Sequence, residues 1–351
     1  MTMEVLIVGT GLIGTSIGLA LTQAGHAVVL ADESAAHLAA AVDLGAGRAV
    51  RSGDTPAVVF VAVPPARVAS VISAYASTYV DATFSDVASV KTQPVADVEL
   101  IDGMSVRFVG GHPMAGRETS GPSGARADLF VDRLWILTPG ASVPEWRVEA
   151  VASLVADCGA VVRRMTPEAH DRAVALTSHT PQVLASLMAG LIAQAPASDI
   201  QLSGQGLRDL TRIAGSSPEL WDEILAANAE EVEAVLDAFA EHLAGVRSAL
   251  RGGASLREML HVGNAGRARI PAKHGGPSRA EDVVVSVAID DRPGALARLF
   301  AAAADAGISI EDVRIDHMVG RENAIVELTV RAGSAPLLID RLTAGGWQIR
   351  S

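Results

Sequence analysis

Short apolar runs alternate with helical segments through the first half of the chain. Several of these runs are apolar at every position, as expected for strands that are buried on both faces of a parallel sheet. The alternation predicts an α/β fold, a Rossmann-like doubly wound parallel sheet, over residues 1–165. The candidate strands are Val5–Val8, Ala27–Leu30, Val58–Val63, Tyr79–Phe84, Val106–Val109 and Leu134–Leu137.

Helical spacing replaces the strand pattern between residues 166 and 260, which predicts an all-helical second domain. Apolar side chains recur at this spacing from Leu225 to Leu250, so we expect one long amphipathic helix, and with it a helix-mediated homodimer. Ser217 and Pro218 are expected as the cap and first residue of that helix or of the turn before it. The segment Val183–Ala193 is apolar all round, which predicts a buried helix.

The last part of the chain returns to mixed strands and helices. Residues 261–281 are rich in Gly, Arg, Pro and Lys and show no periodicity, so we expect a linker there. Residues 282–351 follow the order βαββαβ, which predicts a ferredoxin-like module. Its expected elements are strand Val283–Ile289, turn Asp291–Gly294, helix Ala295–Ala306, strands Ile308–Ile315 and Ala324–Val330, helix Pro336–Thr343 and a strand near Trp347–Ile349.

Charge and cysteine content exclude several classes of protein. The formal net charge of −12 argues against nucleic-acid binding, because neutralising phosphates needs a basic surface. The apolar stretch at Val183–Ala193 is too short to span a bilayer, so we expect no membrane segment. The lone Cys158 excludes an internal disulfide framework and is typical of the reducing cytoplasm. We also expect no metal site.

The first strand leads into a glycine-rich turn that predicts a dinucleotide site. The residues Gly9, Gly11, Leu12, Ile13 and Gly14 form a G-x-G-x-x-G motif between a strand and an amphipathic helix. The glycines allow backbone N–H groups to approach a pyrophosphate at the positive end of the helix. The alternative is a structural turn that binds nothing.

An acidic residue at the end of the second strand indicates which dinucleotide binds. Asp32 is expected to accept hydrogen bonds from the ribose hydroxyls and to repel a 2′-phosphate. Glu33 follows it, and we expect no arginine nearby, so the sequence favours NAD over NADP. Val63 and Pro64, at the C-terminal end of the third candidate strand, are also expected at the cofactor site.

Polar residues at the ends of later strands predict a substrate site beside the cofactor. His112 lies between Gly111 and Pro113, where the backbone is held and a histidine with a pKa near neutral is suited to accept an alcohol proton during hydride transfer. The alternative is a turn histidine bonded to backbone. Ser178 or Thr180 is expected to cap a helix that starts at Pro181.

Two further polar positions in the helical region have more than one interpretation. Asp209 and Arg212 are three residues apart, which fits either a surface ion pair or an oriented arginine that binds a carboxylate. Asn228 falls on the apolar stripe of the expected long helix, and we interpret it as a hydrogen-bonded core residue rather than a site residue.

Five segments in order along the chain resemble the prephenate/arogenate dehydrogenase family. They are GTGLIGTS at 9–16, DVASVK at 86–91, GHPMAGRETSG at 111–121, HDRAVALTSHTPQ at 170–182 and GLRDLTRIAGSSPELWDEI at 206–224. The C-terminal DRPGALARLF within the βαββαβ pattern is similar to an ACT regulatory domain. The resemblance implies NAD-dependent oxidative decarboxylation of prephenate to 4-hydroxyphenylpyruvate in tyrosine biosynthesis, or of arogenate to tyrosine. It also implies an amino-acid effector at the ACT-like domain, tyrosine or phenylalanine; a dimerisation module without a ligand is the alternative.

The resemblance implies a role for each matched position. His112 would be the catalytic histidine, bonded to the substrate's ring hydroxyl, and Ser89 would connect it with the nicotinamide region. The other matched residues would bind the substrate. Arg212 would hold a carboxylate with Asp209 orienting it, and Glu118, His179, Gln182 and Trp221 would lie in or around the pocket.

Two departures from the family pattern leave the ligands open. Many members read S-H-x-P-H where this chain ends in Gln182, which cannot carry charge, so the choice between prephenate and arogenate stays open. Ser309 stands where Asn is frequent in ACT domains, which leaves the effector open. A β-hydroxy acid dehydrogenase is a rival, but such enzymes usually rely on a lysine, and none occurs between Lys91 and Lys273. A non-catalytic amino-acid sensor is a second rival.

Overall fold

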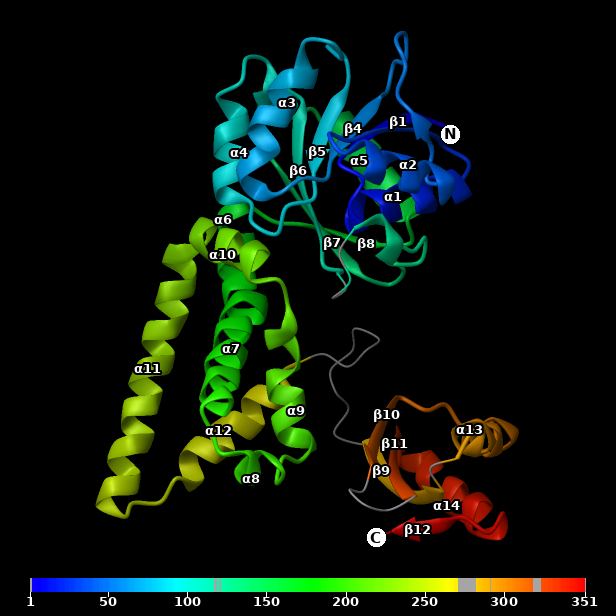
Figure 1. Ribbon diagram of the computed structural model, residues 1–351, viewed down its shortest axis with the longest axis vertical. Coiled ribbons are helices and arrows are strands. Elements are labelled where there is room, and N and C mark those ends of the chain that lie inside the picture. Colours follow the sequence, from blue (N-terminus) through cyan, green and yellow to red (C-terminus); the bar gives the residue numbers. More distant parts are fainter. Residues whose placement is uncertain are drawn as a thin grey trace. The chain divides into compact units, whose positions relative to one another are not determined.

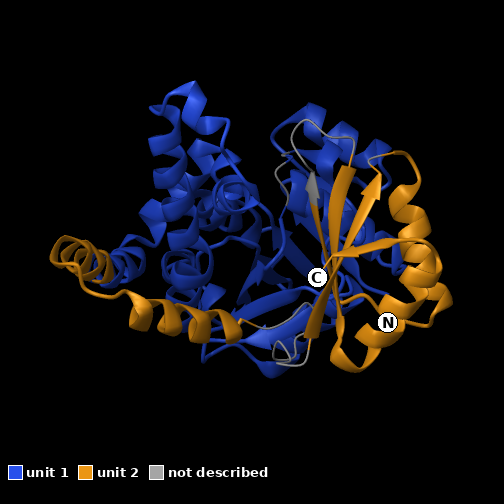
Figure 2. Cartoon of the chain, turned by 90° about the horizontal axis from the view of Figure 1, so that it is seen from below, with its two compact units in different colours: residues 1–241 blue, residues 242–351 orange. Residues whose placement is uncertain are grey.

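The computed structural model describes residues 2–116, 119, 121–270, 282–290, 292–317 and 323–350. The chain divides into two compact units, Met1–Glu241 and His242–Ser351 (Figure 2). In the described residues no helix is long and apolar enough to cross a membrane.

An eight-stranded sheet with the order β3-β2-β1-β4-β5-β6-β7-β8 forms the centre of the first unit. The first six strands pair in parallel, β7 runs antiparallel to β6, and β8 pairs in parallel with β7. The expectation of a purely parallel sheet is therefore wrong for its last two strands. The strands are β1 Glu4–Val8, β2 Ala27–Ala31, β3 Arg48–Ala49, β4 Val58–Val61, β5 Thr83–Asp86, β6 Phe108–Pro113, β7 Leu134–Pro139 and β8 Val161–Arg164.

Helices cover both faces of this sheet, because its strands are apolar on both sides (Figure 1). Along β1, Val5 and Ile7 face one layer, and Leu6 and Val8 face the other. The first layer contains α1 Leu12–Gln23, α2 Ala35–Asp43 and α5 Glu145–Asp157, and the second contains α3 Val68–Ala76 and α4 Thr92–Glu99.

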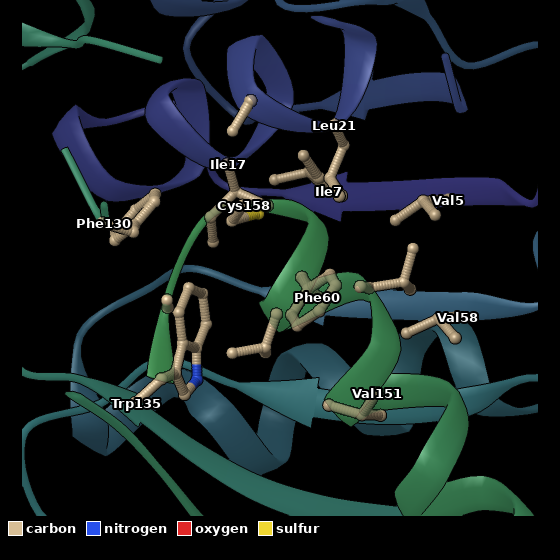
Figure 3. Packing of buried hydrophobic residues seen from close by; sticks show 14 of the residues in the cluster. Val5, Ile7, Ile17, Leu21, Val58, Phe60, Phe130, Trp135, Val151 and Cys158 are labelled. Carbon is tan, nitrogen blue, oxygen red and sulfur yellow. The ribbon is translucent and has the colours of Figure 1, made fainter. Parts of the chain in front are cut away.

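Aromatic side chains fill the middle of the first layer (Figure 3). The ring of Trp135 on β7 lies 5.1 Å from that of Phe130 and 6.1 Å from that of Phe60, measured between centroids. All three side chains are buried, together with Ile17 and Cys158. This packing fixes the antiparallel strand β7 beside β6, the strand that carries the candidate catalytic histidine.

Several strand boundaries differ from the sequence-based expectation. The strand expected at Val106–Val109 is β6, which starts at Phe108 and continues to Pro113, so His112 lies inside a strand and not in a turn. His112 is aligned with Ile136 of β7. The strand expected at Tyr79–Phe84 begins at Thr83. The short strands β3 and β8 were not anticipated.

The helical region starts directly after β8. Thr166 caps α6 by accepting a hydrogen bond from the Ala169 N–H, and Pro167 occupies the first turn. The segments of this region are α6 Pro167–Val174, a π-helical turn Ala175–His179, α7 Thr180–Ala193, α8 Ala197–Ile200, α9 Gln205–Thr211, a 3₁₀ turn Arg212–Gly215, α10 Pro218–Ala227 and α11 Ala229–Gly252.

The structure corrects two expectations about where helices begin and end. The expected long helix is interrupted at Asn228, between α10 and α11. The predicted cap at Ser217 is confirmed, since its hydroxyl accepts a hydrogen bond from the Leu220 N–H. The cap predicted at Ser178 or Thr180 is wrong, because the backbone continues through the π-helical turn into α7 without a break.

The expectation that the segment Val183–Ala193 is a buried helix is also wrong. It forms most of α7, but Leu187 and Leu191 are 61% and 67% exposed. The buried side of α7 instead carries Thr180, Gln182 and Ala185. An apolar helix that is exposed on one side indicates a surface available to another molecule.

The second unit contains the predicted βαββαβ order in a small antiparallel sheet, β10-β11-β9-β12. Buried apolar residues of the sheet pack against its two helices. Helix α12, Arg257–Ala268, occupies part of the segment expected as a linker. The elements are β9 Asp282–Asp290, α13 Ala295–Asp305, β10 Asp312–His317, β11 Asn323–Arg331, α14 Ala335–Ala344 and β12 Gln348–Arg350.

Candidate active site

The glycine-rich turn packs closely against the sheet while leaving the start of α1 open. A Cβ atom on Gly14 would lie 1.9 Å from the Gly9 carbonyl oxygen, and one on Gly9 would lie 2.3 Å from that of Ala62. Among the described residues, no heavy atom beyond the chain neighbours lies within 4 Å of a Cβ position on Gly11, and no side chain caps the helix that it precedes. The positive end of a 12-residue helix is therefore open to an anion such as a pyrophosphate.

A pocket of about 610 Å³ lies beside this turn. Five of the predicted cofactor residues line it: Gly9, Gly11, Asp32, Val63 and Pro64. Leu12 and Ile13 form the first turn of α1, and Gly14 packs behind the loop. Sequence reasoning missed Arg67 and Tyr75, which also line the pocket. The open helix end and this volume fit the pyrophosphate and adenosine parts of a dinucleotide.

The Asp32 carboxylate is held at the edge of the pocket. One oxygen accepts hydrogen bonds from the N–H and hydroxyl of Thr10 at 2.6 and 2.8 Å, and the other accepts from the Ser34 N–H at 2.7 Å. Burial opposes ionisation of this group, but the donors of Thr10 and Ser34 outweigh it and lower the pKa. Asp32 therefore carries a negative charge where a ribose would lie.

The expectation that no arginine lies near Asp32 and Glu33 is wrong. The Arg67 guanidinium contacts the Glu33 carboxylate at 2.7 Å, although 34 residues separate them in the sequence. Because Glu33 engages this cation, the charge of Asp32 still disfavours a 2′-phosphate, as the sequence indicated.

A hydrogen-bonded chain connects His112 on β6 with helix α6. Nδ1 of His112 lies 2.8 Å from Nε2 of His170, and Nδ1 of His170 lies 2.7 Å from the Asp171 carboxylate. His170 and Asp171 are both buried. The chain therefore joins the sheet to the helical region through the half-buried His112 and the buried His170 and Asp171.

The Asp171 carboxylate also accepts hydrogen bonds from the backbone N–H groups of Lys91 and Thr92, both at 2.8 Å. Burial alone would raise the pKa of this carboxyl group. Its hydrogen bonds with His170, Thr92 and Lys91 outweigh burial and lower the pKa. Asp171 is consequently ionised at neutral pH and fixes the first turn of α4 against α6.

A buried ion pair supports the turn on the other side of His112. Lys91 and Asp86 contact each other, and both side chains are fully buried. Asp86 also accepts hydrogen bonds from the N–H groups of Gly111 at 2.9 Å and Ala88 at 3.0 Å. Burial lowers the pKa of Lys91, while the Asp86 carboxylate opposes that shift. The half-buried Ser89 lies within this turn.

The surroundings of His112 favour its neutral form. The pKa of His112 lies well below 6.5 because of burial first, and then because of the neighbouring His170, Lys91 and His179. A neutral imidazole at physiological pH can accept a proton, as a general base must.

The second group of site residues lies around His179 in the π-helical turn. Its Nδ1 lies 3.0 Å from the side-chain nitrogen of Asn228, which also donates to the Asp171 carbonyl oxygen at 3.0 Å. The ring of Trp221 meets that of His179 edge-on, with centroids 5.9 Å apart. Burial lowers the pKa of His179 to about 4, so it is neutral as well.

Polar groups at the start of α7 lie close to this cluster in sequence. The side chain of Gln182 is buried and contacts the Ser186 hydroxyl at 3.5 Å. The buried hydroxyl of Thr180 has no hydrogen-bond partner among the described residues.

The predicted anion-binding residues lie further along the helical region. Arg212 is exposed and begins the 3₁₀ turn Arg212–Gly215, which packs against α7. Asp209 is exposed near the end of α9 and accepts a hydrogen bond from Gln205 at 2.8 Å. Glu118 lies outside the described residues. A meeting of Arg212 with His112 over one substrate stays a prediction.

Several residues around His112 were not assigned a role from the sequence. His170 and Asp171 stood in a motif that was noticed, but nothing indicated that they reach β6. Asn228 was interpreted as a core residue; it is buried and hydrogen-bonded, and it also contacts a predicted site residue, His179. A polar side chain on an apolar stripe was the one signal for it.

Comparison with known proteins gives one consistent result. Residues 17–164 match the family described as prephenate dehydrogenase, nucleotide-binding domain, and residues 166–261 match prephenate dehydrogenase, dimerization domain. A probable prephenate dehydrogenase of Streptomyces niveus is 35% identical, with 99% of each chain covered. The prephenate dehydrogenase of Bacillus subtilis is 29% identical, covering 93% of this chain and 92% of its own.

Solved structures of similar proteins agree with these relatives. Prephenate dehydrogenase from A. aeolicus, in complex with hydroxyphenyl propionate and NAD⁺, has a TM-score of 0.69 at 31% identity. The similarity covers 76% of this chain and 98% of that one. Synechocystis arogenate dehydrogenase has a TM-score of 0.66 at 26% identity, covering 76% of this chain and 99% of its own.

Substitution of Gly11 tests the open helix end. Gly11→Ala places a methyl group where the backbone must approach the pyrophosphate, so we expect NAD⁺ affinity to fall at least about tenfold. The melting temperature should stay near that of the wild type, because no heavy atom of the described residues, chain neighbours apart, lies within 4 Å of that Cβ position. Gly204→Ala is the matched control, since Gly204 also precedes a helix with open space around it. Calorimetric titration showing unchanged NAD⁺ affinity for Gly11→Ala would contradict the assignment.

Proposed function

The chain belongs to the prephenate dehydrogenase family, and we propose that it oxidises prephenate with NAD⁺ through His112 as the general base. The overall reaction converts prephenate and NAD⁺ into 4-hydroxyphenylpyruvate, CO₂ and NADH. The neutral state of His112, together with its hydrogen bond to His170, carries the assignment of the base. Its place on β6, at the sheet edge that also carries the dinucleotide pocket, supports it.

In the proposed reaction, His112 transfers the proton and the hydride goes to NAD⁺. His112 accepts the proton of the ring hydroxyl at Nε2 as the carbonyl forms. NAD⁺ supplies the chemistry of hydride acceptance from the same ring carbon. Loss of the ring carboxylate as CO₂ then returns the electron pair to the ring, which becomes aromatic, and His112 gives its proton back to the resulting phenolate oxygen. Atoms and charges balance without a metal ion or an outside base.

The remaining site residues are proposed to bind and orient. Gly9, Gly11, Asp32, Val63 and Pro64 hold the dinucleotide, since they line the pocket beside α1. Ser89, in the turn after β5, connects His112 with the nicotinamide region. Arg212, oriented by Asp209, receives a substrate carboxylate. Glu118, His179, Gln182 and Trp221 complete the substrate pocket.

Arogenate is the second candidate substrate. It differs from prephenate in carrying an ammonium group where prephenate has a keto oxygen. Gln182 can donate to a keto oxygen or accept from an ammonium group, so this residue permits either. Comparing NADH formation from prephenate and from arogenate, each with NAD⁺ or NADP⁺, identifies the substrate and the cofactor together.

The proposed base is tested by His112→Asn. This variant keeps a polar side chain but cannot take up the proton, so we expect turnover to fall by about 10²–10⁴-fold while NAD⁺ affinity stays unchanged. His26→Asn is the control, since His26 is buried and contacts Asp157 in the same unit but lies outside the site. Wild-type turnover in His112→Asn, measured by NADH absorbance, would remove His112 as the base.

The proposed anion anchor is tested by Arg212→Ala. Loss of a cation that binds the substrate in its ground state should raise the KM for prephenate about tenfold or more and change kcat much less. Arg208→Ala is the matched control, because Arg208 is an exposed arginine in the same helical segment. A KM equal to that of the wild type would exclude Arg212 as the anchor.

We propose that α7 forms part of a homodimer interface. Its leucines Leu187 and Leu191 are exposed, and this part of the chain matches a family named for dimerization. Two such apolar surfaces from two copies of the chain would cover each other in a symmetric contact.

Charges placed in this surface should separate the copies. The double variant Leu187→Glu with Leu191→Glu is expected to sediment as a monomer at concentrations where the wild type is a dimer, because it would bury unpaired carboxylates. Leu100→Glu is the control, since Leu100 is 86% exposed near the sheet. A double variant that stays dimeric would place the interface elsewhere.

We propose that the C-terminal βαββαβ unit is an ACT-like domain that binds tyrosine or phenylalanine. A pocket of about 330 Å³ lies where β9 leads into α13, lined by Asp290, Arg292, Gly294 and their neighbours. Asp290 offers a charge to an ammonium group, and the start of α13 offers its positive end to a carboxylate.

Addition of the amino acid tests this role. Tyrosine or phenylalanine at saturating concentration should raise the melting temperature and change the rate of NADH formation, because ligand binding stabilises the folded state. If neither amino acid alters either quantity, the module binds no such effector.

We propose division into a NAD-binding domain at 1–165, a helical substrate and dimerisation domain at 166–260 and a C-terminal domain at 282–351, and the family matches at 17–164 and 166–261 support the first two. We propose a cytoplasmic location, since the lone Cys158 is a buried free thiol. Partition of the native enzyme activity into the cytosolic fraction would test it.

A further inference from the structure

We propose that Asp171 sets the ring protons of His112 and His179 in opposite positions, so that Nε2 of His112 accepts a proton from substrate while Nε2 of His179 donates one. This inference rests on the proposed function, because it assigns a task to each ring toward the same substrate. It makes His170, Asp171 and Asn228 positioning residues of the site.

The carboxylate of Asp171 determines the state of His112 through His170. A carboxylate can only accept a hydrogen bond, so Nδ1 of His170, at 2.7 Å, must carry the proton. The proposal includes a neutral His170, whose Nε2 is then an acceptor, so that His112 donates to it from Nδ1 over 2.8 Å. The proton of neutral His112 is therefore on Nδ1, and its Nε2 has a free lone pair.

The backbone carbonyl of the same residue determines the state of His179 through Asn228. A carbonyl oxygen can only accept, so the Asn228 atom 3.0 Å from the Asp171 oxygen must be the NH₂ group. That nitrogen also lies 3.0 Å from Nδ1 of His179, which must accept its second hydrogen. Neutral His179 consequently carries its proton on Nε2 and is a donor there.

The opposite proton positions of the two rings fit their different tasks toward the substrate. A lone pair on Nε2 of His112 is what a general base needs at the ring hydroxyl. An N–H on Nε2 of His179 can donate a hydrogen bond to a carboxylate or keto oxygen of the substrate, whereas it cannot accept one from an N–H or O–H group. Trp221, edge-on to His179 at 5.9 Å between centroids, restrains the orientation of that ring.

The charged and titratable groups around these rings are compatible with two neutral imidazoles. Lys91, His170 and His179 face His112, and Asp86 lies beside it through Gly111. Asp171 and His170 face His179. Burial keeps the pKa of both rings below the usual histidine value, so a measurement at pH 7 reports neutral rings.

Nitrogen NMR of histidine-labelled protein tests the proposal directly, because protonated and unprotonated ring nitrogens give well-separated signals. In the full-length wild type at pH 7, we expect His112 with its proton on Nδ1 and His179 with its proton on Nε2. His112→Asn and His179→Asn assign the two rings among the nine histidines. His26 is an internal standard, since its Nδ1 accepts from the Met3 N–H and its Nε2 contacts Asp157.

Two variants test separately the contact of Asp171 with His112 through His170 and its contact with His179 through Asn228. His170→Phe removes the acceptor of His112, so the His112 proton should move to Nε2, while His179 stays unchanged. Asn228→Asp replaces the donor by a carboxylate, so the His179 proton should move to Nδ1, while His112 stays unchanged. In kinetics, His170→Phe should lower kcat about 10²-fold or more with a prephenate KM within about twofold of the wild type.

Each result either supports or overturns the proposed positions of the ring protons. A proton on Nε2 of His112, or on Nδ1 of His179, in the wild type overturns the inference, even if either variant fails to fold. Variants that change both rings together, or neither, also overturn it. If the ring protons of the wild type are where we expect them but His112→Asn turns over like the wild type, the ring assignment stands and only the proposed base is excluded. If His112→Asn has low turnover but the ring protons of the wild type are in the reverse positions, the proposed base stands and the ring assignment is excluded.

Discussion

The buried carboxylate of Asp171 is the interaction on which the rest of the site depends. It accepts hydrogen bonds from His170 and from the backbone of Lys91 and Thr92, so it connects α6, α4 and, through His170, β6. Placing a charge in a site that water does not reach is costly unless donors satisfy it. Backbone donors at the start of α4 and the His170 side chain on α6 together supply the hydrogen bonds that this buried charge needs. The position of the helical region relative to the sheet therefore depends on Asp171 being ionised.

This arrangement explains why an antiparallel strand in a mostly parallel sheet matters for function. Because β7 runs beside β6 and is held by the packing of Trp135, β6 continues through His112 instead of ending before it. A histidine in a strand has fewer backbone conformations than one in a loop, so its ring is held in place before substrate arrives. The buried Lys91–Asp86 pair fixes the neighbouring turn in the same way.

Much of the fold could be predicted from the sequence, because it depends on local patterns. Alternating apolar runs located the sheet, the glycine motif located the dinucleotide turn, and the βαββαβ order of the C-terminal unit was recovered. The reversal at β7 was not predictable in this way, since strand direction depends on connections rather than on the composition of Leu134–Pro139. The break at Asn228 was hidden because apolar spacing continues across it; only its hydrogen bonds to Asp171 and His179 explain it.

The same contrast between local patterns and long-range contacts applies to the residues of the site. Gly9, Gly11 and Asp32 line one pocket as the sequence predicted, because their spacing reflects contacts between nearby segments. His170 and Arg67 were missed because their partners, His112 and Glu33, lie 58 and 34 residues away, and no periodicity encodes such contacts. The exposed leucines of α7 were misread as core because an apolar helix has the same composition whether its own chain or a second copy covers it.

We propose that one substrate lies between a proton-accepting His112 and an anion-binding Arg212 beside the dinucleotide turn. A crystal structure of the enzyme with NAD⁺ and hydroxyphenyl propionate, the ligand pair bound by the A. aeolicus relative, tests it most directly. We expect the phenol oxygen within hydrogen-bond distance of Nε2 of His112 and the carboxylate on the Arg212 guanidinium. A ligand whose phenol oxygen lies away from His112, with Arg212 on the opposite side of the molecule and no second subunit bringing it near, would show that the two residues do not share one substrate.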